Sequence, residues 1–210
     1  KNLTISGNSK LSTDTLDDFS DIKIQNSSNL TAGGEASISC GAVEVNSGSE
    51  VSAPGIEVEA SGDVIIQYGV EGCFKSLGGK NLTIFGNSKL STDTLDDFSD
   101  MEIQNSSNLT AGGESSISCG AIKVDSGSVV SAPGAEVSAD GDIIVQSGSK
   151  GCLKSLSGKN LTVQSGADLT LDTLENVDNI TVMNSSNLDV KEASSISSGA
   201  IGVSYTSKFD

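Results

Sequence analysis

Short runs of alternating apolar and polar residues recur along this chain at nearly regular intervals. In each run the apolar residues stand two positions apart, as Leu3 and Ile5 do in the first one. That period is typical of a β-strand with one face buried and the other in solvent. The pattern predicts eleven such strands, in the runs NLTI at 2–5, DIKI at 21–24, AVEV at 42–45, DVII at 63–66, NLTI at 81–84, DMEI at 100–103, AIKV at 121–124, DIIV at 142–145, NLTV at 160–163, NITV at 179–182 and AIGV at 200–203.

Two weaker strand signals follow each run, separated by clusters of Gly, Asn, Ser and Pro such as NSS at 26–28. Three short strands and three corners per step describe one coil of a parallel β-solenoid. A helix does not fit because no window keeps an i, i+3, i+4, i+7 apolar stripe, and an antiparallel sandwich would not repeat like strands at every third position. We predict an all-β fold, a right-handed parallel β-helix of about eleven coils of 18–21 residues over residues 1–210. The weaker strands offer as inward residues Leu11, Leu16, Phe19, Leu30, Ile38, Val51, Ile56, Val58 and Phe74.

A longer repeat is built on these coils. Residues 1–79 return almost unchanged as 80–158, and 159–210 begin a third, looser copy. A fixed internal period indicates a repeat architecture. Equivalent apolar residues in the first copy and at the start of the second are Leu3, Ile22, Val43, Val64 and Leu82. Each copy should therefore be a block of four coils of unequal length, and the coils, stacked at the strand spacing, would form one rod of roughly 50 Å.

The first two copies differ at 18 of 79 positions, and the differences sort by the direction predicted for each side chain. At inward positions one apolar residue replaces another: Ile22 and Met101, Val43 and Ile122, Val64 and Ile143, Ile66 and Val145, Phe74 and Leu153. At outward positions the charge changes sign: Lys23 and Glu102, Glu44 and Lys123, Glu71 and Lys150. A packed interior tolerates volume-conserving exchange, and exposed charges are usually interchangeable. We therefore expect the exchanged charges to lie on the surface and to form no repeated ligand set.

Asparagine recurs at two places near one corner of each copy. The first place holds Asn26, Asn105 and Asn184, and the second holds Asn29, Asn108 and Asn187. Because Asn tolerates left-handed backbone geometry and can hydrogen-bond locally, we expect both sets to lie in turns.

The four cysteines, Cys40, Cys73, Cys119 and Cys152, follow one another at intervals of two coils. Two coils separate backbones by roughly 9–10 Å, whereas a disulfide needs Cα atoms within about 7 Å. We therefore predict four reduced and mostly buried thiols.

Charge and composition exclude several functions. Twelve lysines face 28 acidic residues, for a net charge of −16, and the chain has no Arg, His or Trp. Such a balance opposes binding to nucleic acid or to an anionic membrane. The missing Arg and His remove two common acid–base groups, and only 3% of residues are aromatic. We expect no enzyme, no bound cofactor other than a possible Ca²⁺, no nucleic-acid partner and no membrane insertion.

One dense acidic segment, DTLDDFSD, is the only candidate for metal chemistry. Carboxylates at such spacing could hold Ca²⁺ or supply the paired acids of a glycosidase, and they could equally form a solvated corner that keeps the rod soluble. Its occurrence in every copy opposes a unique active site. The candidate Ca²⁺ ligands are Asp14, Asp17 and Asp18, Asp93, Asp96 and Asp97, and Asp172 and Glu175.

Stretches such as SSNLTAGGEASISCGAVEVNSG and PGIEVEASGDVIIQ resemble the β-helical repeats of filamentous-haemagglutinin-type adhesins and autotransporter passengers. That resemblance implies an extracellular or cell-surface fibre or stalk. GCFKSLGGKNLTI and GCLKSLSGKNLTV also look like β-helical carbohydrate-binding modules of bacterial surface proteins. Neither resemblance carries ligand residues onto this chain.

The leading expectation is thus a structural repeat segment of an extracellular fibre or adhesin. A Ca²⁺-assisted polysaccharide-binding module is the alternative, and a polysaccharide lyase or hydrolase is the third. An uncapped solenoid exposes unpaired strand edges. We therefore expect the terminal coils to meet either further repeats of a longer chain or a second subunit stacked end to end, with polysaccharide or a host surface as further possible partners.

Overall fold

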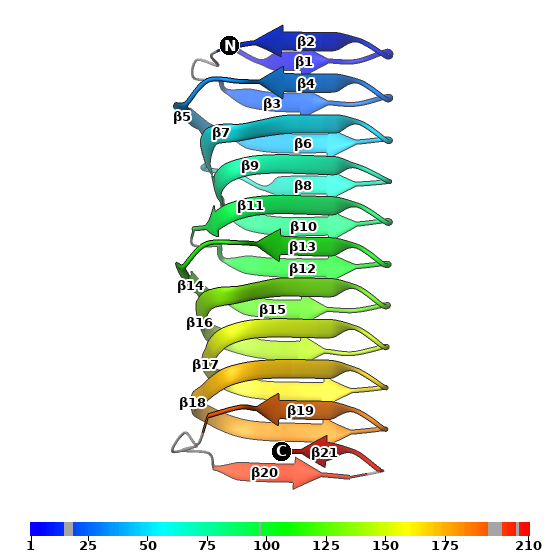
Figure 1. The fold of residues 1–210 in the computed structure, drawn as a ribbon, viewed down its shortest axis with the longest axis vertical. Helices are drawn as coiled ribbons and strands as arrows, with labels where there is room; N and C mark the ends of the chain where they lie inside the picture. Colours follow the sequence, from blue (N-terminus) through cyan, green and yellow to red (C-terminus); the bar gives the residue numbers. More distant parts are fainter. Residues whose placement is uncertain (15–18, 97, 193–198, 205) are drawn as a thin grey trace.

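The computed structural model, which describes residues 1–14, 19–96, 98–192, 199–204 and 206–210, is a parallel β-solenoid of about ten turns (Figure 1). Each turn carries three faces. The first face is formed by β1 (Leu3–Ile5), β3 (Asp21–Ile24), β6 (Ala42–Asn46), β8 (Val64–Gln67), β10 (Asn81–Phe85), β12 (Asp100–Gln104), β15 (Ala121–Val124) and β20 (Ala200–Val203). The second face holds β2 (Lys10–Thr13), β4 (Asn29–Ala32), β13 (Asn108–Ala111), β19 (Asn187–Val190) and β21 (Lys208–Phe209).

The third face holds β5 (Ala36–Cys40) and β14 (Ser115–Cys119). Some strands run around a corner without a break. Those that cover the second and third faces are β7 (Glu50–Ala60), β9 (Glu71–Gly78) and β11 (Lys89–Leu95). Three longer strands run on through the second and third faces into the first face of the following coil: β16 (Val129–Val145), β17 (Lys150–Gln164) and β18 (Asp168–Met183).

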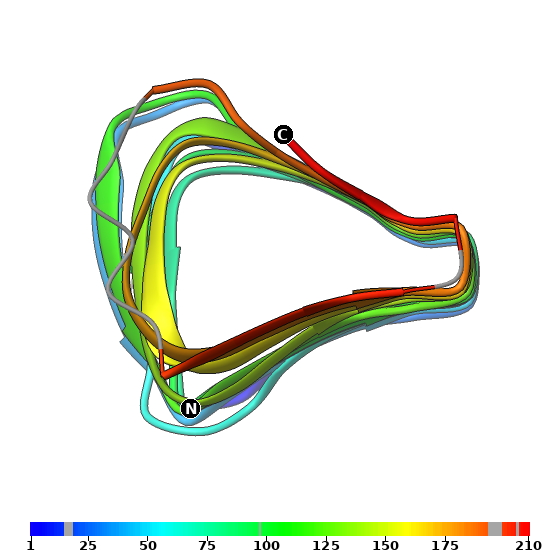
Figure 2. The same ribbon diagram turned by 90° about the horizontal axis from the view of Figure 1, so that it is seen from below.

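The observed register confirms the predicted coil lengths. Leu3 pairs with Ile22, Ile22 with Val43, Val43 with Val64 and Val64 with Leu82, which are the four steps expected from the sequence. All pairings between neighbouring coils are parallel, and each of the eleven predicted runs overlaps a strand on the first face. Seen from the C-terminal end, the chain runs counter-clockwise as it approaches the viewer, so the solenoid is right-handed as predicted (Figures 1 and 2).

The cross-section is a triangle with one narrow corner, between the first and second faces, and a broad opposite side (Figure 2). Traces of successive coils superpose closely at the narrow corner and spread apart on the broad side. Across the narrow corner the inward residues are always six apart, as from Ile5 to Leu11 and from Ile24 to Leu30. Differences in coil length are therefore absorbed on the broad side.

The core is the stack of inward apolar residues predicted from the alternation. Ile38, Val51, Ile56 and Val58 are buried, Leu11 and Phe19 are half-buried against the core, and Leu16 lies outside the described residues. The inward exchanges between copies are also buried at both members, except Leu153, which is half-buried where the first copy has the buried Phe74. An apolar cavity of about 30 Å³ lies in the second copy and is lined by Leu153 and Val145 among others. Both are smaller than their first-copy counterparts, Phe74 and Ile66.

None of the four cysteines forms a disulfide, as expected. Cys40 and Cys119 are buried, but Cys73 and Cys152 are only half-buried. The prediction of mostly buried thiols is wrong for that second pair, because each pairs in register with outward residues of the second face, as Cys73 does with Ser52 and Ser91.

Candidate functional site

The narrow corner is a tight turn with two successive residues in the left-handed region. In the first copy these are Asn26 and Ser27, with φ of 58° and 56°, and in the second Asn105 and Ser106, with 56° and 59°. Asn184 has the same geometry, with φ 58°. Asn and Gly adopt this region at low cost. The turn prediction is therefore confirmed for this set of asparagines.

The second set of asparagines lies elsewhere. Asn29, Asn108 and Asn187 each begin a second-face strand instead of occupying a turn. Their side chains point outward along that strand, where Asn29 donates to Glu50 of the next coil at 3.2 Å. The prediction that they lie in turns is wrong, because the turn closes one residue earlier, at a serine.

That serine forms a buried ladder along the narrow corner. Its members are Ser28, Ser49, Ser88, Ser107, Ser128, Ser149 and Ser186, each at most 2% exposed. The hydroxyl oxygen of one coil accepts the backbone N–H of the coil before it, for example from Ser88 to Ser107 and from Ser107 to Ser128, both at 3.2 Å. Ser88 also donates its hydroxyl to the carbonyl of Phe85 at 2.8 Å.

Two apolar residues interrupt the ladder. Val70 and Ala167 take the serine position in their coils. Val70 and Ala167 still donate their own N–H groups to Ser88 and Ser186, both at 3.2 Å, but they offer no hydroxyl to the coil before them. Buried polar backbone groups are costly when unpaired, so this ladder is a structural element of the corner.

Outward charges on the first face are paired between neighbouring coils. Lys23 Nζ lies 2.8 Å from Glu44, and Asn46 donates to the same carboxylate at 2.7 Å. In the second copy the polarity is reversed, with Lys123 Nζ 2.9 Å from Glu102. These charges lie at the surface as expected, and the two partners of each pair change sign together between the copies.

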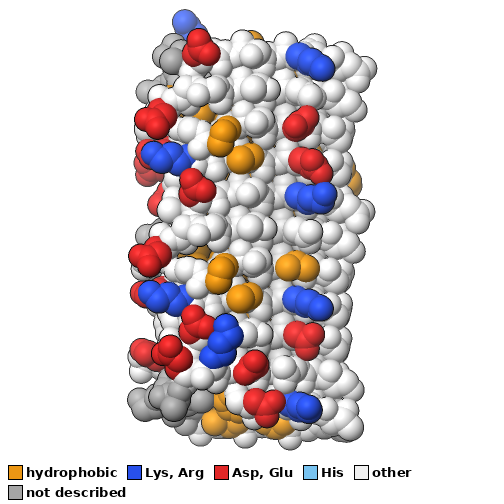
Figure 3. Space-filling model, in the orientation of Figure 1, with side chains coloured by type: hydrophobic (Ala, Val, Ile, Leu, Met, Phe, Trp, Pro, Cys, Tyr) orange, Lys and Arg blue, Asp and Glu red, His pale blue; other side chains and the backbone are white. Residues whose placement is uncertain are grey.

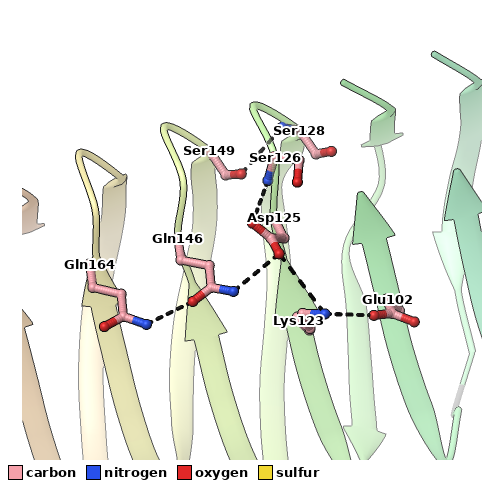
Figure 4. Close-up of polar contacts among 8 residues, drawn as sticks. All are labelled: Glu102, Lys123, Asp125, Ser126, Ser128, Gln146, Ser149 and Gln164. Atoms are coloured by element: carbon pink, nitrogen blue, oxygen red, sulfur yellow. Dashed lines mark hydrogen bonds and ion pairs between the residues drawn. The ribbon is translucent and has the colours of Figure 1, made fainter. Parts of the chain in front are cut away.

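Asp125 replaces Asn46 in the second copy, beside the reversed pair (Figure 4). Asp125 lies 3.9 Å from Lys123 and accepts hydrogen bonds from the Ser126 N–H at 2.6 Å and from Gln146 at 3.1 Å. Burial opposes its ionisation, but the bonds from Ser147, Gln146 and Ser126 and the charge of Lys123 outweigh burial and lower the pKa of Asp125. The hydrogen bond to Glu102 raises the pKa of Lys123.

The second face is flat and largely uncharged at its centre, with charged side chains in columns near its two edges (Figure 3). In one column Glu71 and Lys89 form an ion pair at 2.9 Å. Four coils further on, Lys150 and Asp168 are register partners at the same place. An open depression beside this column is lined by Cys73, Glu71 and Lys89.

The third face carries ion pairs whose polarity is the same in both copies. Lys75 lies 2.8 Å from Glu57, and Lys154 lies 2.6 Å from Glu136. Another open depression there is lined by Lys154, Asp172, Glu175, Glu136 and Glu192.

The candidate Ca²⁺ ligands are not assembled into one site within the described part of the chain. Asp14, Asp93, Asp96 and Glu175 are exposed, and Asp96 accepts from the Ser76 hydroxyl at 2.5 Å. Asp172 is paired with Lys191 at 3.0 Å. No group of three or more Cys, Asp or Glu among the described residues could hold a metal ion. Asp17, Asp18 and Asp97 lie outside the described residues.

The thiols differ in environment as well as exposure. Burial, with the nearby charge of Asp21, raises the pKa of Cys40 to about 11. Burial and the charge of Asp93 also raise the pKa of Cys73. Both therefore stay protonated at neutral pH, which does not favour a nucleophilic role.

The serine ladder and the exchanged ion pairs were not anticipated from the sequence. The ladder had a signal, since Ser occupies one place in all but two of the coils. The ion pairs also had one, because each reversed charge lies one coil from another reversed charge. Neither signal can be interpreted until the coil register is fixed.

Comparison of the chain with protein-family models, with curated proteins and with solved structures gave no match. The described residues contain no helix that is long and apolar enough to span a membrane.

Proposed function

We propose that this chain is a structural repeat segment of an extracellular or cell-surface fibre. The observation that carries the proposal is the distribution of polar contacts. The serine ladder runs along the narrow corner from coil to coil, and ion pairs recur on all three faces instead of converging on one place. Solenoids stabilised by nearest-neighbour contacts are extended by adding coils, so length itself is a property that such a protein can supply.

The surface and the repeats support the same proposal. A net charge of −16 favours solubility of a long rod. The Gly-, Ser-, Asn- and Thr-rich coils resemble the β-helical repeats of surface adhesins, and the extracellular placement rests on that resemblance.

Contact with a further coil is part of this proposal. Ile201 and Val203 in β20 are 51% and 46% exposed, whereas their equivalents in earlier coils are buried, apart from the half-buried Leu3 of the first coil. A coil placed below β20 would cover them, whether it belongs to the same polypeptide or to a second copy. Electron microscopy at rising protein concentration tests whether a second copy covers β20. End-to-end stacking of copies predicts rods that lengthen with concentration. The variants Ile201→Lys and Val203→Lys should keep the rods at single-chain length.

Polysaccharide binding assisted by Ca²⁺ is the alternative function. The third-face depression around Lys154 is the feature that favours polysaccharide binding, but the described carboxylates that line it form no group that could hold Ca²⁺. A glycan array probed with and without chelator decides between the two functions. A structural segment predicts no glycan binding and a melting temperature unchanged by chelator. Chelator-sensitive binding to an acidic or neutral glycan would replace the proposal, and cleavage of the bound glycan would indicate the lyase or hydrolase.

A further inference from the structure

At three positions the charge changes sign between the first two copies, and each of these charges has an oppositely charged partner in a neighbouring coil. Elsewhere a charge is gained or lost without an oppositely charged partner among the described residues, as at Glu50 and Val129, Glu59 and Ser138, and Ser61 and Asp140. On the first face, Lys23 above Glu44 in the first copy becomes Glu102 above Lys123 in the second, at 2.8 and 2.9 Å. The third member of the group changes with them, since Asn46, a donor to Glu44, becomes Asp125, an acceptor beside Lys123. In this group of three residues the contact between neighbouring coils stays attractive in both copies.

The boundaries between copies show the same reversal on the second face. The first copy meets the second through Glu71 and Lys89, which lie 2.9 Å apart. The second copy meets the third through the register partners Lys150 and Asp168. Each boundary therefore joins opposite charges, but in opposite order.

Aromatic and amide contacts at the narrow corner also distinguish these two boundaries. At the first, Tyr68 packs edge-on against Phe85 with ring centroids 5.5 Å apart. At the second, Ser147 and Gln164 occupy the equivalent positions, and Gln164 donates to Gln146 at 2.7 Å. A coil from one boundary would meet an unmatched surface at the other.

Near-identity of the copies makes wrong pairing a real hazard. The first two copies differ at only 18 of 79 positions, and most of the inward differences conserve volume. A block of one copy could therefore accept a coil of another with little change in backbone or core, and misassembly is a characteristic failure of repeat proteins. In any such exchange the reversed pairs bring like charges together. Lys23 would face Lys123, and Glu71 would face Asp168.

We propose that the reversed ion pairs make each coil surface specific for its own neighbour in the chain. The partner that fits is the next coil in sequence, and the equivalent coil of another copy, in the same molecule or in a second one, is rejected by like charge. Specificity of this kind needs a repulsive element against the wrong partner as well as an attractive one for the right partner. The reversed pairs lie at every second coil boundary, between the second and third coils of each block and between blocks.

The third-face pairs provide an internal contrast. Glu57 with Lys75 and Glu136 with Lys154 keep the same polarity in both copies, so they join neighbouring coils but cannot distinguish one copy from another.

The test gives the reversed positions the same polarity in both copies and keeps opposite charges at each of these coil contacts. An equalised chain restores the first-copy polarity throughout and carries Glu102→Lys, Lys123→Glu, Asp125→Asn, Lys150→Glu and Asp168→Lys. A matched control inverts every pair in both copies, so that native contacts and discrimination are both kept. It carries Lys23→Glu, Glu44→Lys, Asn46→Asp, Glu71→Lys and Lys89→Glu together with the five changes of the equalised chain.

Each chain is unfolded, refolded at low ionic strength, and analysed by light scattering for exchanged dimers and by limited proteolysis for looped-out coils. The equalised chain should give about a fivefold larger misassembled fraction than the wild type, as expected when an exposed like-charge contact becomes an ion pair. The inverted control should match the wild type. Equal misassembly in all three chains, or as much in the control as in the equalised chain, would overturn the proposal.

A second measurement needs no variant. At about 1 M salt the screening length falls to about 3 Å, so discrimination by surface charge should disappear. Refolding the wild-type chain in such salt should raise its misassembled fraction to that of the equalised chain, whose own fraction should not change. A wild-type fraction independent of salt would contradict the proposal even if a variant failed to fold.

Discussion

Truncation of one hydroxyl in the buried serine ladder should destabilise the rod more than loss of any of its surface ion pairs. Ser88 is fully buried, accepts the N–H of Val70 at 3.2 Å and donates to the carbonyl of Phe85 at 2.8 Å. Ser88→Ala removes both bonds and leaves the buried Val70 N–H without that acceptor. Each intramolecular hydrogen bond contributes about 0.5–1.5 kcal/mol net, so the expected loss in unfolding free energy is about 1–3 kcal/mol.

Denaturant unfolding followed by circular dichroism measures this loss, with Ser91→Ala as the matched control. Ser91 lies three residues away on the exposed second face, and its truncation should change stability by less than about 0.5 kcal/mol. The reverse change, Ala167→Ser, should stabilise by less than about 1 kcal/mol, because it supplies a second acceptor to the Ser149 N–H, which already donates to the Gln146 carbonyl at 3.2 Å. If Ser88→Ala and Ser91→Ala unfold at the same denaturant concentration, the ladder is not a stabilising element.

Three further predictions follow from the core, the thiols and the acidic group. Leu153→Phe restores the first-copy residue beside the cavity of about 30 Å³; at about 24 cal/mol per Å³ it should stabilise by about 0.7 kcal/mol in urea unfolding, and a loss of stability would show that the site cannot accept the ring. A thiol reagent at pH 8 should modify the two half-buried cysteines in the native protein but Cys40 and Cys119 only after unfolding; four equal rates would contradict the described burial. The pKa of Asp125 is lowered on folding, so its contribution is present above the unfolded value near 4 and disappears as the pH falls through the lower folded value. Asp125→Asn should therefore reduce stability at pH 7 but make little difference at pH 2, and an equal effect at both values would show that ionisation is not involved.

Features governed by local alternation and period were predictable from the sequence. The runs around Leu3, Ile22 and Val43 set the strands, their spacing set the register, and the inward residues followed from both. These features depend on one physical requirement, that each coil cover the apolar residues of the next.

Polar contacts between coils were not predictable at the same stage. The role of Ser107 depends on bonds to Ser88 and Ser128 in the two neighbouring coils, and Asn29 resembles a turn residue although the turn closes just before it. Taken singly, the change of charge at Lys23 and the change at Glu44 each look like a neutral surface substitution. Once the register pairs them, the two changes become a single event.

The constant narrow corner has a consequence for design. The inward residues on its two sides are always six apart. Every coil therefore begins its second face at the same position and angle in the cross-section, whatever the length of its broad side. The narrow corner fixes where the second-face strand begins, and the length of the broad side can vary from coil to coil. Peptides inserted on the broad side at equivalent sites of successive blocks, near Gly33 and Gly112, would be displayed in a line at intervals of roughly 19 Å, four strand spacings apart. Duplicating a block would then add display sites without changing the distance between them.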